Sequence, residues 1–283
     1  MFRIFFVIAL CISIKMNSFG QKKGVQNFIK IIYKMSYQLD SLNNTDSKIE
    51  LMELLYNDSI SIFQSVGIGM IDSMNYEGQK HNPNYNVRNE KKYATIPRPK
   101  VHYVINRLDN VIDVFDTYKY GGLRSDGYQH YMERMELDWN MTRKTDTLLG
   151  YFVQQAFLQF GGREWECWFA PSIPISAGPY KFYGLPGLII KIKDKTNSWE
   201  FSINSIENDV YRAVFDKSKA IPNITKTDKM SFFQSRNHYL QNRTIIDEQN
   251  GDIIILSSES RKELIKKDKV FTAKNNNWIE LFP

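Results

Sequence analysis

One segment, residues 178–194, restricts the backbone of this chain more than any other. It combines three glycines and two prolines with the apolar run Leu188–Lys193. Pro186 fixes φ near about −65° and Gly187 accepts φ > 0, so a type II turn is predicted to start a strand at Leu188. Pro186 also removes a backbone donor, which argues against a phosphate-binding loop. We interpret the segment as a structural or recognition loop, with candidate residues Gly178, Pro179, Tyr180, Phe182, Gly184, Leu185, Pro186, Gly187 and Leu188.

Apolar and polar residues alternate with period two along much of the chain, which predicts half-buried strands. Gly161-Gly162 predicts a two-residue hairpin turn, and residues 142–146 predict another turn. The predicted strands are 25–39, 49–63 with a break at Asn57-Asp58, 101–105, 111–115, 135–141, 151–160, 165–169, 188–193 and 199–206. A shared parity places Trp139, Trp165 and Phe169 on one candidate aromatic core face, with Met135, Leu137 and Cys167.

The residue pattern in the last third of the chain predicts two helices. Thr225 and Asp228 resemble a capping box ahead of the first, and residues 258–269 form the second. Asp252–Leu256 predicts a short strand between them. Residues 65–99 are poorly patterned, and we expect them to be the least ordered part of the chain or a lid-like insertion. The expected fold is therefore mainly β (α+β), a curved antiparallel sheet or open half-barrel with about two C-terminal helices.

Residues 1–20 predict a cleaved signal peptide. Arg3 precedes the uncharged apolar run 4–14, and small residues follow before Gln21. Residues 21–283 are then expected to form a single domain in the periplasm or at the outer-membrane periphery, with no transmembrane segment. Removing residues 1–20 lowers the net charge from +6 to +4, because Arg3 and Lys15 are lost and no acidic residue is. The sequence has no stripe of Lys and Arg with interleaved aromatic residues, so nucleic-acid binding is not predicted.

Catalytic, cofactor and metal motifs are not found in the sequence, so none is predicted. The four histidines are far apart, without ligand spacing, and no Gly-x-Ser-x-Gly elbow occurs. Two carboxylate pairs, Glu136/Asp138 and Glu164/Glu166, are interpreted as the wet face of a sheet. Cys167, the one cysteine after residue 20, is expected to be a small buried residue without a reactive role.

Gly184-Leu-Pro-Gly-Leu-Ile189 resembles the signature of the GLPGLI family of exported proteins from Bacteroidetes-type bacteria. The resemblance extends over the mature chain, through 148–151, 155–156, 162–163, 168–170, 173–175, 178–182 and 277–281. Members often carry Cys where Val153 stands and Ala where Cys167 stands, so the resemblance assigns no thiol-based role. It implies export and an association with outer-membrane transport systems, but no activity and no catalytic residue.

Three functions are compatible with these patterns. We expect an exported binding or accessory protein, because the predicted sheet has an aromatic face that could hold an apolar small ligand. The first alternative is a structural partner of an outer-membrane transporter. The second is a hydrolase of envelope substrates that would use dispersed residues such as Asp194, Glu166 or Ser176, and that would require them to converge in one cleft.

Overall fold

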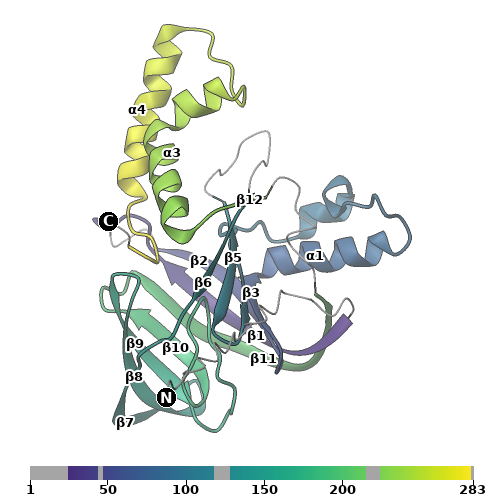
Figure 1. Ribbon diagram of the computed structural model, residues 1–283, viewed down its shortest axis with the longest axis vertical. Helices are drawn as coiled ribbons and strands as arrows, with labels where there is room; N and C mark the ends of the chain where they lie inside the picture. Colours follow the sequence, from purple (N-terminus) through teal and green to yellow (C-terminus); the bar gives the residue numbers. More distant parts are fainter. Residues whose placement is uncertain (1–24, 44–46, 118–127, 215–223, 282–283) are drawn as a thin grey trace, which may run out of the picture.

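The computed structural model describes residues 25–43, 47–117, 128–214 and 224–281 (Figure 1). The expected signal peptide lies outside these residues. No helix among them is long and apolar enough to cross a membrane.

All strands of the described residues belong to one twelve-stranded sheet. Its spatial order is β12-β6-β5-β4-β3-β2-β1-β11-β10-β9-β8-β7. The strands are β1 (Val25–Tyr37), β2 (Lys48–Tyr56), β3 (Ser61–Ser65), β4 (Val104–Leu108), β5 (Val111–Asp116), β6 (Gln129–Arg134), β7 (Asn140–Leu148), β8 (Tyr151–Phe160), β9 (Arg163–Ala170), β10 (Leu188–Asp194), β11 (Trp199–Ala213) and β12 (Thr225–Lys226). Every described pairing is antiparallel except that of β12 with β6.

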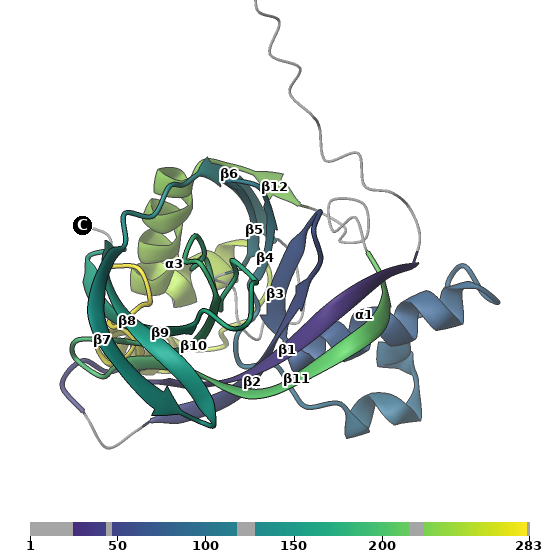
Figure 2. The ribbon, with the colours of Figure 1, turned by 90° about the horizontal axis from the view of Figure 1, so that it is seen from below.

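The sheet is open but strongly curved. Strands β12 and β7 are its two edges and do not pair with each other, and Figure 2 shows that the strands follow a strongly curved path from one edge to the other. The expected fold class, a mainly β open half-barrel, is therefore confirmed. Alternating side chains of β1 point to opposite faces of the sheet, so one face supplies core residues. Ile31, Tyr33, Met35 and Tyr37 are buried on that face, whereas Lys34 is exposed.

Three helices accompany the sheet in the described part of the chain. Helix α1 (Val66–Gln79) starts at Ser65, whose side chain accepts a bond from the Gly67 amide. Together with the 3-10 helices Val87–Asn89 and Lys91–Thr95, it gives the poorly patterned region a small core of its own. Helices α3 (Lys229–Gln249) and α4 (Ser258–Lys274) form the expected C-terminal pair, a hairpin that stands away from the sheet in Figure 1.

Several predicted elements lie where expected. The Gly161-Gly162 turn has φ of 60° and 74°, joins β8 to β9 and thereby confirms the hairpin. Strands β10 and β11 form the second predicted hairpin. The predicted strand 49–63 is two strands, β2 and β3, which turn at Asn57 and pair with each other.

Strand 135–141 was wrongly predicted. Residues 135–139 connect β6 to β7 without joining the sheet. Two of their hydrogen bonds go to the 178–194 segment instead, because Trp139 Nε1 donates to the Tyr183 carbonyl at 2.7 Å and the Tyr183 hydroxyl donates to the Met135 carbonyl. The predicted turn at 142–146 is also wrong, since these residues continue β7 and the chain turns at Leu149-Gly150.

Two C-terminal predictions need correction. Thr225 lies in β12, and Asp228 itself caps α3 by accepting a bond from the Ser231 amide at 2.9 Å. Asp252–Leu256 forms no strand and connects α3 to α4. The four apolar residues after Asp252 have no strand neighbour at the end of a helical hairpin, so their β propensity is not used.

Candidate functional site

The 178–194 segment is mainly core rather than surface. Tyr180, Phe182, Leu185 and Leu188 are buried, whereas Gly184 and Pro186 are exposed. Phe182 lies 4.7 Å from the ring centroid of Trp165 and 6.4 Å from that of Trp139. The segment therefore packs its apolar side chains into the main core, on the inner face of the curved sheet. It contacts both Trp139 and Trp165 of the predicted aromatic face, and Phe169 is buried in the same core.

Gly187 is needed for a reason other than the predicted turn. Its φ is not in the left-handed region, and Gly184 takes φ of 96° instead. A Cβ at Gly187 would lie 2.7 Å from the Ala170 carbonyl carbon, closer than non-bonded atoms pack. The type II turn with positive φ at Gly187 is thus wrong. The glycine permits close contact between the segment and the end of β9.

A buried lysine links this segment to the sheet, to α3 and to the residues after α4. Lys181 is 1% exposed, and its Nζ lies 2.5 Å from Glu133 Oε1 of β6 and 2.6 Å from Glu280 Oε1. It also donates to the Tyr131 hydroxyl at 3.1 Å. Lys229 at the start of α3 contacts the same two carboxylates at 2.6 and 2.8 Å. The positive charges of the two lysines are therefore balanced by the negative charges of the two carboxylates.

The charges in this cluster stabilise one another. Burial alone would disfavour the ionised form of Glu280, but Lys181 and Lys229 outweigh it and lower the pKa of Glu280 to about 2. Burial also opposes the charge on Lys181, and the Glu280 carboxylate outweighs it and raises the pKa of Lys181. Tyr180 donates to Glu280 at 2.6 Å, and burial raises the pKa of this phenol well above its usual range.

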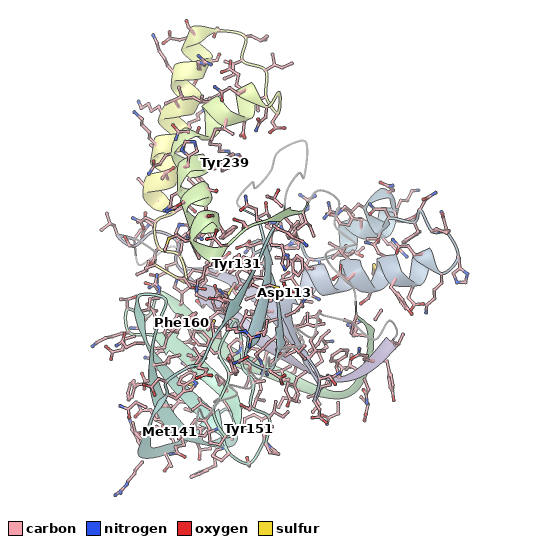
Figure 3. All side chains as sticks on the ribbon, in the orientation of Figure 1. Asp113, Tyr131, Met141, Tyr151, Phe160 and Tyr239 are labelled. Carbon is pink, nitrogen blue, oxygen red and sulfur yellow. The ribbon has the colours of Figure 1, made fainter. Side chains whose placement is uncertain are left out.

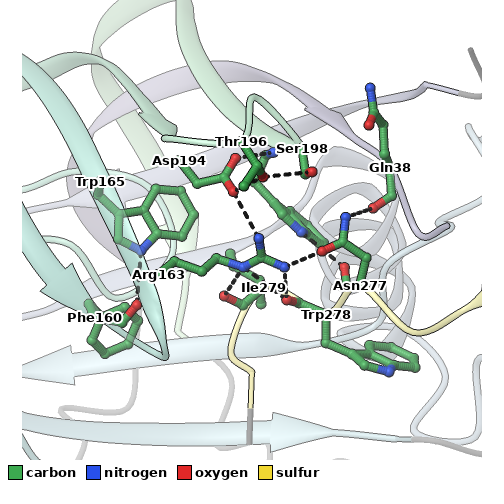
Figure 4. A network of polar contacts seen from close by, with 11 residues as sticks. Gln38, Phe160, Arg163, Trp165, Asp194, Thr196, Ser198, Asn277, Trp278 and Ile279 are labelled. Carbon is green, nitrogen blue, oxygen red and sulfur yellow. Dashed lines mark hydrogen bonds and ion pairs between the residues drawn. The ribbon is translucent and has the colours of Figure 1, made fainter. Parts of the chain in front are cut away.

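A second polar network holds the residues that follow α4, 275–281, hereafter the C-terminal strap. Arg163 Nη1 donates to Asp194 at 2.8 Å, and its other nitrogens donate to the Trp278 and Ile279 carbonyls and to the Asn277 side chain (Figure 4). Further bonds run from the Leu281 amide to the Gly161 carbonyl and from the Asn277 amide to Leu39. The strap therefore adheres to the sheet along its length.

Between the sheet, the strap and the hairpin lies an apolar pocket of about 420 Å³. Its walls come from distant parts of the chain. The lining residues are Tyr37, Leu39, Lys48, Lys100, Val101, Tyr103, Val114, Asp116, Tyr131, Tyr180, Trp199, Phe232, Phe233, Arg236, Leu240, Phe271, Asn275, Trp278 and Ile279. Figure 3 shows Tyr131 below the base of the hairpin, with Tyr239 further along α3. The size suits a small organic molecule.

Aromatic side chains dominate this pocket. Tyr37 and Trp199 stack at 5.2 Å between ring centroids, and Tyr103 meets Tyr180 edge-on at 5.4 Å. Phe232 lies 5.5 Å from Tyr131, which joins the hairpin to the sheet. These rings expose flat apolar faces, which favour a planar or chain-like apolar ligand.

Four charged residues interrupt the apolar lining: Arg236, Asp116, Lys48 and Lys100. Arg236 is 7% exposed, and its guanidinium lies 4.2 Å from the Trp278 ring centroid and 4.4 Å from that of Phe233. Burial raises the pKa of Asp116 to about 6, although the Thr117 amide and Arg236 act in the opposite direction. The pocket thus has an excess of cationic groups and one carboxyl that titrates near neutrality.

The residues proposed for a hydrolase do not share a cleft. Asp194 is buried against Arg163 at the end of β10, and Glu166 lies opposite Lys193, on the other face of the sheet. Ser176 accepts a bond from the Gly184 amide, before β10 begins. Asp194 is six residues along that strand from Leu188, about 20 Å away. These three residues therefore do not form a catalytic group together.

Cys167 is fully buried in β9, and burial raises the pKa of its thiol well above the usual range. It packs as a small core residue, as predicted. No cluster of three potential metal ligands from His, Cys, Asp and Glu occurs among the described residues.

Sequence reasoning missed the pocket almost completely. Of the predicted loop and aromatic-face residues, only Tyr180 lines it. Lys181 offered an unused signal, since a lysine between Tyr180 and Phe182 in an apolar segment suggests a buried charge with partners. Arg236 offered none, because a single arginine in a predicted helix is ordinarily solvent-exposed.

One family model matches part of the chain. Residues 161–191, which run from the β8–β9 turn through the buried segment into β10, match the family described as "Protein of unknown function (Porph_ging)". The match thus covers the Arg163 and Lys181 positions and no residue of α3, α4 or the strap. No curated protein matches the chain.

Among solved structures, two crystal forms of PNGF-II are similar to this chain. The structure in space group P21 has a TM-score of 0.46 and covers 74% of this chain, and the structure in C2 has 0.48 and covers 75%. Both are 14% identical to it, and this chain spans 33% of theirs.

Proposed function

We propose that this chain is an exported binding protein whose pocket takes a mostly apolar small molecule with one acidic group. The observation that carries the proposal is the 420 Å³ pocket lined by aromatic rings between the sheet and the α3–α4 hairpin. Binding proteins keep such a space open, whereas a stable core closes it, since interiors pack at crystal-like density. Export is supported by the apolar run at residues 4–14.

The charged residues favour a ligand with an acidic group. Three of the four charged lining residues are cationic, and Arg236 is fixed between two rings. A carboxylate or sulfonate near Arg236 would make a charge-assisted hydrogen bond in a region of low dielectric. Asp116 would oppose an anion when ionised, and therefore acts against binding above its pKa of about 6.

The first experiment is direct identification of what the protein carries. The full chain is purified from an exporting bacterial host and examined by native mass spectrometry, with organic extraction of any bound molecule. We expect a bound apolar molecule in at least part of the population. The second measurement is the fluorescence of anilinonaphthalene sulfonate, an aromatic probe with one acidic group, titrated with the delipidated protein.

A blocking variant separates pocket binding from surface binding. Val114→Phe adds volume to a buried pocket wall on β5, whereas Val270→Phe adds the same volume to a half-exposed position on α4. We expect Val114→Phe to weaken probe binding by about ten-fold or more, which corresponds to about 1.4 kcal/mol, and Val270→Phe to leave it unchanged. Equal binding by the two variants, or no probe binding by the wild type, would overturn the proposal.

The alternative role, as a partner of an outer-membrane transporter, stays a prediction. Tyr180 and Phe182 cannot serve as its recognition surface, because both are buried. Alanine at these positions would test the stability of the core. A test of partnership would have to change exposed residues such as Pro186.

A further inference from the structure

The connection between α3 and α4 carries a run of four apolar residues, Ile253–Leu256, hereafter the hairpin tip. Ile254 is 86% exposed and Leu256 is 93% exposed. Two large aliphatic side chains that are exposed close together at the end of a protruding element lose the apolar burial that ordinarily stabilises them, so they indicate an interaction site. In Figure 1 the connection that carries the tip lies at the end of the hairpin away from the sheet.

The tip is held by an ordered frame. The amides of Asp252 and Ile253 donate to the Asp247 carbonyl at 2.8 and 3.3 Å, which ends α3. Ser257 caps α4 by accepting a bond from the Ser260 amide at 3.1 Å. Arg261 of α4 forms an ion pair with Glu248 of α3, which joins the two helices beside the tip. The exposed side chains are therefore presented in a fixed place.

Basic residues follow the tip along α4. The helix contains six lysines and arginines against three acidic residues, and none of its residues is buried. Lys262, Lys266 and Lys267 are exposed within the first three turns. An apolar end with cations behind it matches a bilayer whose surface is anionic, because aliphatic side chains enter the acyl region while lysines reach the phosphates.

We propose that the hairpin tip inserts into the surface of an anionic phospholipid membrane. The exposed aliphatic side chains of the tip suit the acyl region of a bilayer, and the net positive charge of α4 complements anionic headgroups. Phe271, which lines the pocket, is thirteen residues from Ser258, or about 20 Å along the helix. Insertion would hold the pocket within that distance of the membrane.

Vesicle co-sedimentation tests the proposal. The probes are vesicles of equal parts phosphatidylglycerol and phosphatidylcholine, and vesicles of phosphatidylcholine alone. We expect the wild-type protein to partition at least about ten-fold more strongly onto the anionic vesicles, and added salt to weaken this binding. The double variant Ile254→Ser with Leu256→Ser should lose at least about ten-fold of the binding to anionic vesicles.

Leu42→Ser is the matched control. Leu42 is 90% exposed in the turn after β1, so this variant removes a similar apolar side chain away from the tip. It should bind vesicles as the wild type does. Leu256→Trp should show a blue-shifted emission increment with anionic vesicles, and Leu42→Trp should not. Circular dichroism and the Tm confirm that all variants fold, since every changed side chain is exposed.

Three outcomes would overturn the proposal. Wild-type protein that ignores both vesicle types refutes membrane insertion. Equal binding by the tip variant and the Leu42→Ser control refutes the assignment to the tip. A dimer that forms without lipid and dissociates in the tip variant, seen by analytical ultracentrifugation, would assign the tip to a second copy of this chain. None of these outcomes depends on whether the pocket holds a ligand.

Discussion

Replacing Glu280 by Gln should remove the ionic contacts between the strap and the two lysines, Lys181 and Lys229, with almost no change in side-chain volume. Glu280 lies between Lys181 and Lys229, at 2.6 and 2.8 Å, and it accepts a bond from Tyr180. A glutamine keeps one acceptor but carries no charge. Lys181 then has Glu133 as its remaining carboxylate partner. The buried Lys181 and the partly exposed Lys229 are then left with one carboxylate charge, that of Glu133, instead of two.

The pKa of Glu280 gives the magnitude. It falls from an ordinary 4.5 to about 2 in the folded protein, a difference worth about 3 kcal/mol of unfolding free energy near pH 7. This agrees with the range of about 3–5 kcal/mol for removing one partner of a buried ion pair. For a chain of this size we expect Tm to fall by roughly 6–12 °C.

The pH dependence tests the cause. Because the folded pKa is depressed, the stabilisation is fully present above the unfolded pKa of 4.5 and is lost as pH falls toward 2. The difference between the wild type and Glu280→Gln should therefore shrink from about 3 kcal/mol at pH 7 to about 1 kcal/mol at pH 3. Urea unfolding monitored by tryptophan fluorescence at both pH values measures it.

The control is Glu263→Gln. Glu263 pairs with Lys267 on the exposed surface of α4, so this variant also neutralises one carboxylate of an ion pair. Its Tm should equal that of the wild type, because exposed pairs contribute little. A Glu280→Gln protein with unchanged stability, or with a deficit that is the same at pH 3 and pH 7, would refute the reasoning.

Three further predictions concern the same framework. Gly187→Ala should cost about 3 kcal/mol of stability, because the added Cβ would overpack against Ala170. Gly150→Ala should cost about 1 kcal/mol, because Gly150 has φ of 84° but open space at the Cβ position. Equal losses of stability in thermal unfolding would contradict the steric account. Asp116→Asn should abolish a weakening of anilinonaphthalene sulfonate binding as pH rises through about 6, since the carboxylate that repels the sulfonate would be absent; a persisting pH step would assign it to another group. Arg163→Met should release the strap and leave Asp194 unpaired, lowering unfolding free energy by about 3–5 kcal/mol, and limited proteolysis should then cut near residue 275, a site that must stay protected in the wild type.

The fold class was predictable because alternation records which side chains face the core. Tyr33 and Met35 alternate with Lys34 in β1, and their burial follows that pattern. Residues 135–139 show where alternation misleads. Leu137 and Trp139 do face the interior. However, the hydrogen bonds that Trp139 Nε1 and the Met135 carbonyl make with Tyr183 go to the buried segment and not to a neighbouring strand.

The pocket could not be predicted, because its walls meet only in the folded chain. Tyr37, Asp116 and Trp278 are separated by at least seventy-nine residues and have no common local pattern. The position of the hairpin over the sheet depends on Glu280 and Lys229, which read individually as surface charges. Burial and pairing of these groups follow from the tertiary fold, and local propensity carries no information about them.

The place of β1 in the sheet constrains the order in which the chain can fold. Strand β1 lies between β2, which follows it directly, and β11, which begins 162 residues after β1 ends. At about 5–20 residues per second of synthesis, one edge of a thirteen-residue strand would wait roughly 10–30 s for its partner. An unpaired edge of this length is a template for aggregation. A chaperone that covers residues 25–37 until Trp199–Ala213 have been made would therefore raise the yield of folded protein.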